Sequence, residues 1–352
     1  MIFVIDRRDC TLRYQGGCLI LQRKDKKDRQ IPIQPLEQVI IYGNPLVEAS
    51  VFRALAGAGV PVMMLAARGK QPFAICGGGL AVQLPLRRRQ HRLAGYAEGA
   101  LNMARWFVIR KMENYDLPLA VLGESGSGQQ ADLDDFRRLR DQSVQKLHSA
   151  GSHASILGIE GRLAHAWFAL LAKQLPYKWK FAGRNRRPPR DPVNALLSLG
   201  YTLLLSEVTH GVGQAGLDPS LGFLHRDYPG RESLALDFTE IFRSGVDCFV
   251  LALLHSEKLE CDSFYYRKTE GCRMSKAARS VFYQNWGHYR EAWPRREPLP
   301  DQRGAVRYGP LREYINGQVM EVRNYMKQLE KEYGITFAET GNDTGCAQSD
   351  MA

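Results

Sequence analysis

The hydrophobic pattern of the chain changes near residue 80, and this change limits the folds that the chain can adopt. Before it, short apolar runs are separated by Gly, Pro, Asp and Lys, as in β-strands joined by turns. After it, apolar residues recur every three or four positions over long segments, as in amphipathic helices. A chain of 352 residues can bury a core in each of two such parts. We therefore predict an α+β fold, with a small β-rich N-terminal domain at 1–80, a larger all-helical C-terminal domain at 81–340 and a disordered tail at 341–352.

The expected elements follow from these patterns. Strands are expected at IFVID (2–6), CLILQR (18–23), IPIQPLEQVIIYG (31–43), VPVMMLA (60–66) and FAICG (73–77). Between two of them, Asn44 and Pro45 are expected to open a helix that ends at Gly57 and Gly59. Helices of the second part are expected at about 88–113, 131–148, 155–173, 192–210, 236–257, 273–292 and 310–333.

A carboxylate interrupts the apolar face of one expected helix. Apolar residues at 156, 159, 163, 167, 170 and 171 form a single stripe, and Glu160 falls on it. An unpartnered carboxylate in such a position is costly to ionise, so it needs a cation, a hydrogen-bond donor or a metal ion. The alternative is a Glu at the edge of the stripe that reaches solvent or a neighbouring arginine.

Further along the chain, Asp237 and Glu240 are three residues apart and project from the same side of an expected helix. Acids near a helix N-terminus are also favoured by the helix dipole alone. His225 precedes the pair, and a single His beside Arg226 and Asp227 is more often a hydrogen-bonded residue than a ligand. The order of the groups, with a Glu, a basic loop, a His and then two acids, gives the set its weight.

One imidazole with two carboxylates suits Mg²⁺ or Mn²⁺ and leaves coordination positions for water and phosphate oxygens. Zinc is not expected, because the chain contains no H-E-x-x-H and its seven cysteines include no C-x-x-C pair.

The charge balance indicates a polyanionic partner. Lys and Arg number 48 against 37 Asp and Glu, a formal net charge of +11, and the excess is clustered. The clusters are Arg87, Arg88, Arg89 and Arg92; Lys178, Lys180, Arg184, Arg186, Arg187 and Arg190; and Arg267, Lys268, Arg273, Lys276 and Arg279. A solvated face explains most charge runs, but three runs that flank an acidic site favour DNA binding. Our candidate DNA-binding residues are Arg184, Arg186, Arg187, Arg190, Lys276 and Arg279.

The basic loop at 184–190 has a rigid end. Pro188 and Pro189 keep it from being helical, and Asp191 followed by Pro192 is a favourable N-cap and first turn for the next helix. Arginines held at such a helix entrance suit contacts to phosphates, which position a duplex without reading its sequence.

Three motifs occur in one order: GIEG at 158–161, GFLH at 222–225 and SLALD-x-x-E at 233–240. In this combination the chain resembles the metal-dependent integrase and endonuclease family of CRISPR adaptation, which inserts new spacers into the array. The resemblance implies that Glu160, His225 and Glu240 ligate the metal and that Asp237 is an accessory catalytic carboxylate. Because the last ligand is Asp in some members and Glu in others, the resemblance leaves open which of Asp237 and Glu240 touches the metal.

The resemblance also implies a reaction and an assembly. A free 3′-hydroxyl of a short double-stranded DNA, the spacer precursor, attacks a phosphodiester of the repeat array, and no protein nucleophile is needed. The β-rich domain forms a homodimer, and a small ferredoxin-fold adaptation protein bridges two such dimers. The long helical domain is then the catalytic and DNA-binding part.

Other functions remain open from the sequence. One is a hydrolytic, structure-selective DNase that uses the same metal site. Another is a non-catalytic DNA-binding scaffold whose acids only cap helices. A covalent mechanism is suggested by four tyrosines and disfavoured by the nearby acids and His; the tyrosines are Tyr201, Tyr228, Tyr265 and Tyr266.

The N-terminus and the cysteines indicate a cytoplasmic protein. Charged residues at 6–8 interrupt the first apolar run, and no apolar run is long enough to span a bilayer, so we expect no membrane partner. The odd number of cysteines without framework spacing fits a reducing compartment.

Overall fold

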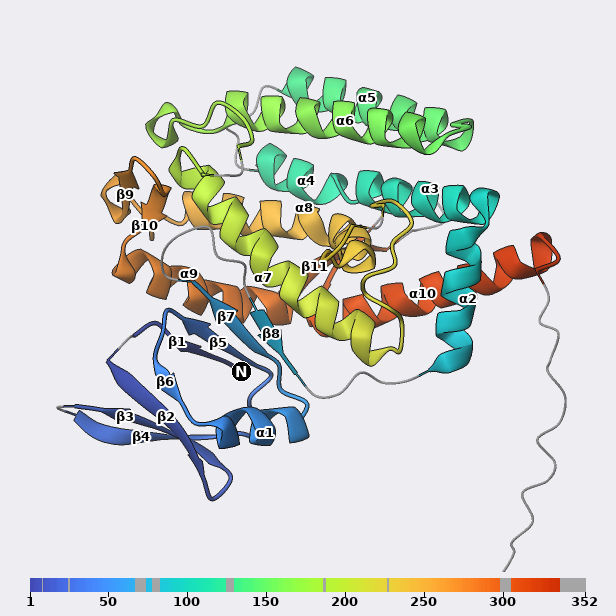
Figure 1. Ribbon diagram of the computed structural model, residues 1–352. Helices are drawn as coiled ribbons and strands as arrows, with labels where there is room; N and C mark the ends of the chain where they lie inside the picture. The colour runs from blue at the N-terminus through green and yellow to red at the C-terminus, as the bar shows by residue number, and fades with distance from the viewer. Residues whose placement is uncertain are drawn as a thin grey trace, which may run out of the picture.

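The structure is a computed structural model, and it describes residues 1–7, 9–24, 26–66, 74–77, 83–124, 130–185, 188–226, 228–297 and 305–335. A β-rich N-terminal part, blue at the lower left of Figure 1, leads into a larger part made mostly of helices. The predicted fold class is confirmed.

Two four-stranded sheets form the N-terminal part. The first has the order β1 (Ile2–Ile5), β5 (Gln38–Tyr42), β7 (Val62–Leu65) and β8 (Ala74–Cys76), with β5 parallel to β1 and β7, and β8 antiparallel to β7. The second has the order β4 (Lys26–Pro32), β3 (Cys18–Arg23), β2 (Cys10–Gln15) and β6 (Leu46–Val47). Helix α1 (Ala49–Gly57) follows β6.

The first sheet separates two hydrophobic cores. Successive side chains of a strand point to opposite faces of its sheet. On β5, Val39 and Ile41 pack into the core of the N-terminal part, together with Leu55 of α1. Ile40, between them, packs with Met63 into the core of the helical part. The alternation therefore fixes the N-terminal part against the helices.

The helical part begins at residue 84. Its helices are α2 (Leu84–Gly95), α3 (Ala97–Glu113), α4 (Asp116–Glu124), α5 (Gln130–His148), α6 (His153–Gln174), α7 (Pro192–Gln214), α8 (Ser233–His255), α9 (Lys276–Tyr289) and α10 (Leu311–Glu332). Two antiparallel hairpins lie among them: β9 (Phe264–Arg267) with β10 (Gly271–Met274), and β11 (Trp293–Glu297) with β12 (Ala305–Gly309).

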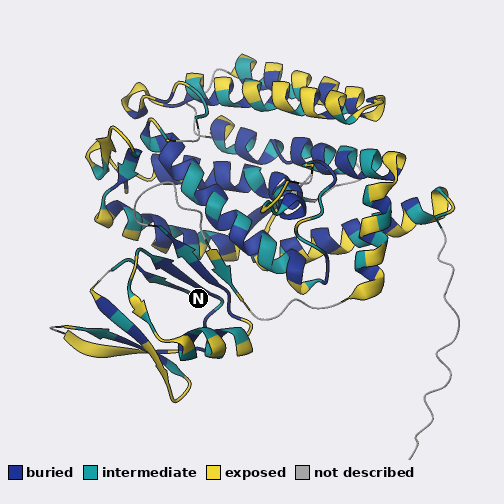
Figure 2. Cartoon of the chain, in the orientation of Figure 1, coloured by how far each residue is buried: buried dark blue, intermediate teal, exposed yellow. Residues whose placement is uncertain are grey.

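Helix α8 occupies the centre of this part and packs against α7, α3 and α4. Figure 2 shows α7 and α8 as largely buried, whereas α5 and α6 expose their outer faces. Close packing depends on Gly245 of α8, because a Cβ there would lie 2.4 Å from the ring of Trp293. The central helix therefore provides rigid positions for the side chains that it carries.

The hairpins were not predicted. The helix expected at 273–292 begins only at Lys276, where Oγ of Ser275 accepts the N–H of Ala278 at 3.2 Å. The residues just before it, 271–274, pair instead with β9. These strands are four residues long, too short for an alternating pattern to stand out.

Other boundaries also shifted. The helix expected from Asn44 begins at Ala49, because Leu46 and Val47 pair with β2. The helix expected at 88–113 is two helices, α2 and α3, which are divided at Tyr96, where the backbone is extended. The domain boundary predicted at residue 80 and the tail predicted at 341–352 both lie outside the described residues, so they stay predictions.

Ion pairs join the two parts. Arg290 donates to Glu207 of α7 at 2.8 Å and to Glu37 of the N-terminal part at 2.5 Å. Nε of Arg279 lies 3.0 Å from Oδ2 of Asp6. Among the described residues, none of the helices has both the length and the apolar character needed to cross a bilayer.

Candidate metal site and DNA-binding surface

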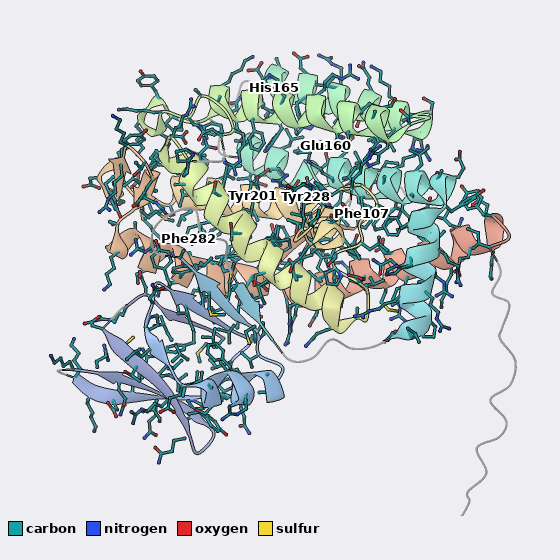
Figure 3. All side chains as sticks on the ribbon, viewed as in Figure 1. Phe107, Glu160, His165, Tyr201, Tyr228 and Phe282 are labelled. Carbon is teal, nitrogen blue, oxygen red and sulfur yellow. The ribbon has the colours of Figure 1, made fainter. Side chains whose placement is uncertain are left out.

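Three helices bring two carboxylates onto one ammonium group. Glu160 comes from α6, Glu240 from α8 and Lys111 from α3. Nζ of Lys111 donates to Oε1 of Glu160 and lies 2.5 Å from Oε2 of Glu240. Glu160 is labelled in Figure 3 between α6 and the helices beneath it. Two acids from separate sequence motifs therefore meet at one point in the fold.

The stripe predicted around Glu160 is present. Ile156, Ile159 and Leu163 are all buried, and Glu160 stands at its edge with 21 % of its side chain exposed. Both expectations for Glu160 are therefore met in part, because its carboxylate contacts the buried ammonium of Lys111 and is still partly exposed to solvent.

Glu240 is held as a carboxylate by two cations. Its Oε1 accepts a hydrogen bond from Arg243 at 2.7 Å, in addition to the contact of Oε2 with Lys111. Burial on its own would raise the pKa of Glu240. Arg243 and Lys111 outweigh burial and, with a smaller contribution from nearby His225, lower the pKa far below its usual range. Glu240 is therefore ionised at every pH at which the protein would be used.

Asp237 anchors the loop that carries His225. Its Oδ2 accepts the backbone N–H groups of Phe223 at 2.6 Å and Leu224 at 2.9 Å. Its Oδ1 accepts the backbone N–H of His225 at 2.8 Å and lies 2.7 Å from the ring Nδ1. A carboxylate only accepts, so Nδ1 donates to it, and in the neutral ring the lone pair is on Nε2. Asp237 is fully buried, and its contacts orient the imidazole.

The candidate ligands do not form a complete metal site as their side chains stand. As the side chains stand, no three His, Cys, Asp or Glu of the described residues lie close enough to share one. Glu160 and Glu240 nevertheless converge on a single cation, and the Lys111 ammonium marks its position. Carboxylate oxygens are the ligands that Mg²⁺ and Mn²⁺ prefer, so the chemistry of the two acids suits such an ion, while the Lys111 ammonium occupies the space between them. The assignment of Glu160, His225 and Glu240 as ligands stays a prediction.

Lys111 was missed in the sequence, although a signal was present. It falls on the buried stripe of α3, with Ala104, Phe107 and Val108, and a lysine is almost never buried without a partner. Burial would lower the pKa of Lys111, but attraction to Glu240 and the other nearby anions raises it. The residue is therefore a permanent cation inside the candidate site.

The buried ring of Tyr201 packs against the guanidinium of Arg243. The guanidinium of Arg243 lies 4.5 Å from the ring centroid of Tyr201, and that of Arg184 lies 5.5 Å from it. The Tyr201 hydroxyl donates to Asp247, which also accepts from Nε1 of Trp167 at 2.9 Å. Burial raises the pKa of Tyr201 well above its usual value. Tyr201 is thus a packing residue and is poorly suited to be a nucleophile.

The candidate DNA-binding residues lie in different surroundings. Arg184 donates to Asn194 at 2.8 Å and to Ser198 at 3.1 Å, both on α7. Arg190 and Lys276 are exposed. The loop is fastened to the β9–β10 hairpin, since the N–H of Cys272 donates to the carbonyl of Pro189 at 2.7 Å. Arg186 and Arg187 lie outside the described residues.

Arg279 differs from the rest of this set. Its guanidinium is paired with Asp6, donates to the carbonyl of Met274 at 2.9 Å and lies 4.6 Å from the ring centroid of Tyr42. Only 15 % of the side chain is exposed. This engagement weighs against a contact with DNA, and that role stays a prediction.

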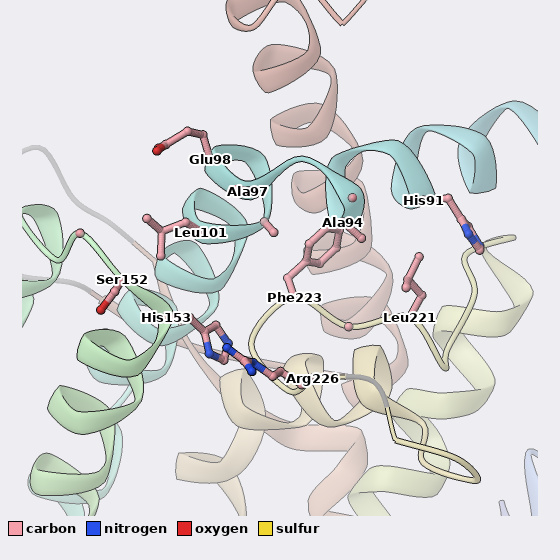
Figure 4. Close-up of a pocket in the computed structure, with 14 residues that line it drawn as sticks. His91, Ala94, Ala97, Glu98, Leu101, Ser152, His153, Leu221, Phe223 and Arg226 are labelled. Carbon is pink, nitrogen blue, oxygen red and sulfur yellow. The ribbon is translucent and has the colours of Figure 1, made fainter.

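A pocket of about 780 Å³ lies beside the loop of His225 (Figure 4). Phe223 and Arg226, on either side of His225 in the sequence, both line it. His91 of α2 and His153 of α6 are also in the wall, and Nε2 of His153 lies 2.7 Å from the carbonyl oxygen of Leu224. The pocket therefore borders the loop that carries His225, on the side of Phe223 and Arg226.

The sequence matches the family model described as CRISPR associated protein Cas1 over residues 3–288. The chain belongs to the Cas1 family. The family predicted from the three motifs is thus confirmed. CRISPR-associated endonuclease Cas1 1 of Thermodesulfovibrio yellowstonii is 34% identical over 284 residues, which cover 79% of this chain and 88% of that protein.

Solved structures agree with the Cas1 family fold. A casposase bound to integration product matches with a TM-score of 0.79 and 21% identity, over 93% of this chain and 91% of that one. A Cas6-RT-Cas1–Cas2 complex matches with a TM-score of 0.72 and 21% identity, over 94% of this chain and 35% of that chain. At this identity the likeness concerns the fold.

Proposed function

We propose that this chain is a divalent-metal-dependent DNA integrase that inserts short DNA duplexes into a CRISPR array by transesterification with a 3′-hydroxyl. The observation that supports it most is the convergence of Glu160 and Glu240 on one cation beside His225. Membership of the Cas1 family, a relative named as an endonuclease and a casposase with this fold also support it.

Glu160, His225 and Glu240 would hold Mg²⁺ or Mn²⁺. Such an ion, when bound, lowers the pKa of an attacking hydroxyl and neutralises charge on the phosphate under attack. The protein supplies the rest. Arg243 keeps Glu240 ionised, and Asp237 accepts from Nδ1 of His225, so that Nε2 is the ring nitrogen available to bind the ion.

The pocket beside His225 suits the end of a DNA strand. Phe223 and Leu221 offer apolar surface to a base, and Arg226 offers a cation to a phosphate. The pocket borders the loop that carries His225, and a strand end positioned there would favour a DNA hydroxyl over water as the nucleophile. Exposed Arg190 and Lys276 would contact phosphates of the duplex.

A strand-transfer assay tests this function. The chain is mixed with a repeat-containing target, Mg²⁺ or Mn²⁺, its partner protein and a short duplex with either free or dideoxy 3′ ends. Free ends should give branched products and dideoxy ends none. Glu160→Gln and Glu240→Gln should each lose roughly a factor of 10³ in rate, because one ligand of the ion is weakened.

Two other outcomes would replace the proposal. Equal nicking of both duplexes without branched products would indicate a hydrolytic DNase. DNA binding with no metal-dependent change in the DNA would indicate a scaffold.

We also propose a homodimer formed by the N-terminal domain at 1–80, with residues 81–340 as the catalytic and DNA-binding domain. Membership of the Cas1 family supports the dimer. The strands CLILQR (β3) and VPVMMLA (β7) are each paired on both sides, and the edge strand β4 carries charged residues that disfavour pairing, so a free strand edge is not the proposed contact. A structure with this fold is named as a Cas6-RT-Cas1–Cas2 complex, which supports a second protein in the assembly; we propose that it is the small ferredoxin-fold adaptation protein. Light scattering should give about twice the 39.8 kDa of the chain, and a monomer at micromolar concentration would contradict the dimer.

A further inference from the structure

The cation between the two candidate ligand carboxylates belongs to the protein itself. Lys111 is only 4 % exposed, and its ammonium contacts Glu160 and Glu240 at once. These are the oxygens that a divalent ion would need. Two cations cannot occupy the same space between two carboxylates, so Lys111 and the ion exclude each other there.

We propose that Lys111 is an internal placeholder cation, which holds Glu160 and Glu240 together in the metal-free protein and is displaced when the divalent ion binds. This inference rests on the proposed function, because it takes the two carboxylates to be metal ligands. It makes Lys111 a positioning residue that sets the metal affinity of the site.

In the metal-free state, the two carboxylates depend on nearby cations for charge compensation. Arg243 already compensates Glu240 through Oε1, but Lys111 is the only charged partner that the described contacts give to Glu160. Without the ammonium, two carboxylates from different helices would face each other, and like charges at this range repel. Removing Lys111 therefore destabilises the empty site and leaves the loaded site less affected. By linkage, the metal then binds more tightly.

The second consequence is structural. Lys111 joins α3 to α6 and to α8, whereas α6 otherwise packs mainly with α5 on the outside of the bundle. Binding of the ion replaces an ammonium cross-link between α6 and α8 by a metal cross-link. The helix that carries Glu160 is thereby held in place before and after loading.

The test is a titration of the full chain with Mn²⁺, in which electron paramagnetic resonance measures the concentration of free Mn²⁺. Lys111→Met should lower the Kd for Mn²⁺ about tenfold, which corresponds to ~1.4 kcal/mol. Lys111→Gln should act in the same direction and keeps the fold, because its amide still donates hydrogen bonds to a carboxylate. Lys173→Met is the matched control. Lys173 lies on α6, as Glu160 does, and its exposed ammonium pairs with Asp132 of α5. This variant should leave the Kd within about twofold, since exposed charges are screened.

Thermal unfolding gives a second readout. Metal-free Lys111→Met should unfold at a lower temperature than the wild type, and Mn²⁺ should narrow the difference. If the wild type binds Mn²⁺ and both Lys111 variants bind it equally or more weakly, the placeholder inference is overturned and the proposed function stands. If no variant and no wild-type protein binds Mn²⁺, both are overturned.

Discussion

The ring Nδ1 of His225 lies 2.7 Å from Oδ1 of Asp237, and the same carboxylate accepts the backbone N–H of His225 at 2.8 Å. Asp237 therefore fixes both the ring and the loop that carries it. This separates its role from that of Glu240, which contacts Lys111 and Arg243 instead. The spacing along the helix does not show which of the two acids is the metal ligand, whereas their contacts differ.

The first prediction concerns these two acids. Asp237→Asn exchanges an acceptor for a donor facing backbone N–H groups, so the free energy of unfolding should fall by ~2–4 kcal/mol. Strand transfer should fall less than in Glu240→Gln, since Asp237 acts through His225. Both variants are compared by urea unfolding and by single-turnover strand transfer. A greater loss of rate in a folded Asp237→Asn protein would make Asp237 the ligand.

The second prediction is a pH dependence of stability at Asp247. Burial raises its pKa from the ordinary value of 3.8 to about 6. Between these values the native chain holds more protons than the unfolded chain, so this contribution is complete below pH 4 and is lost as the pH rises through 6. Its size is at most ~3 kcal/mol, at 1.4 kcal/mol per pKa unit.

Asp247→Asn should lack this dependence because an amide does not titrate, and the variant should still fold because the amide can accept from Trp167 and donate to Tyr201. Urea unfolding at pH 4.5 and 7.5 should therefore show that the wild type loses more stability than the variant over this interval. If both proteins lose the same free energy of unfolding over this interval, the pKa of Asp247 is not raised.

The third prediction tests the basic loop. Arg190→Ala should weaken binding to duplex DNA of any sequence and reduce the slope of log K against log salt by about 0.9, the value for one lost phosphate contact. Arg138→Ala of α5 is the control, because Arg138 is also exposed but pairs with Asp135 on its own helix. Identical slopes of log K against log salt for the wild type and Arg190→Ala would show that Arg190 does not contact a phosphate and that this part of the loop is an ordinary solvated surface.

Much of the site was predictable because each part is encoded locally. The stripe from Ile156 to Leu171 marks Glu160 as an acid on a buried face, and the three-residue spacing places Asp237 and Glu240 on one side of α8. The N-cap expected at Asp191 is also present, since its Oδ1 accepts the N–H of Asn194 at 2.8 Å.

The remainder depends on contacts between distant segments. Arg279 belongs to a basic cluster in the sequence, yet its partner, Asp6, is 273 residues away in the chain. Lys111 and Glu160 are likewise on different helices, so no spacing rule connects them. Sequence patterns assign a residue to a face, and only the fold says which charge it meets there.

The proposed function requires Glu160 and Glu240 to hold a divalent ion beside His225. The most direct measurement is the anomalous scattering of manganese in crystals of the full chain grown with Mn²⁺. A manganese peak is expected between these carboxylates at about 2–2.5 Å from an oxygen of each, with the Lys111 ammonium no longer between them. Crystals with the Lys111 contacts unchanged and no manganese at this position, at saturating Mn²⁺, would contradict it.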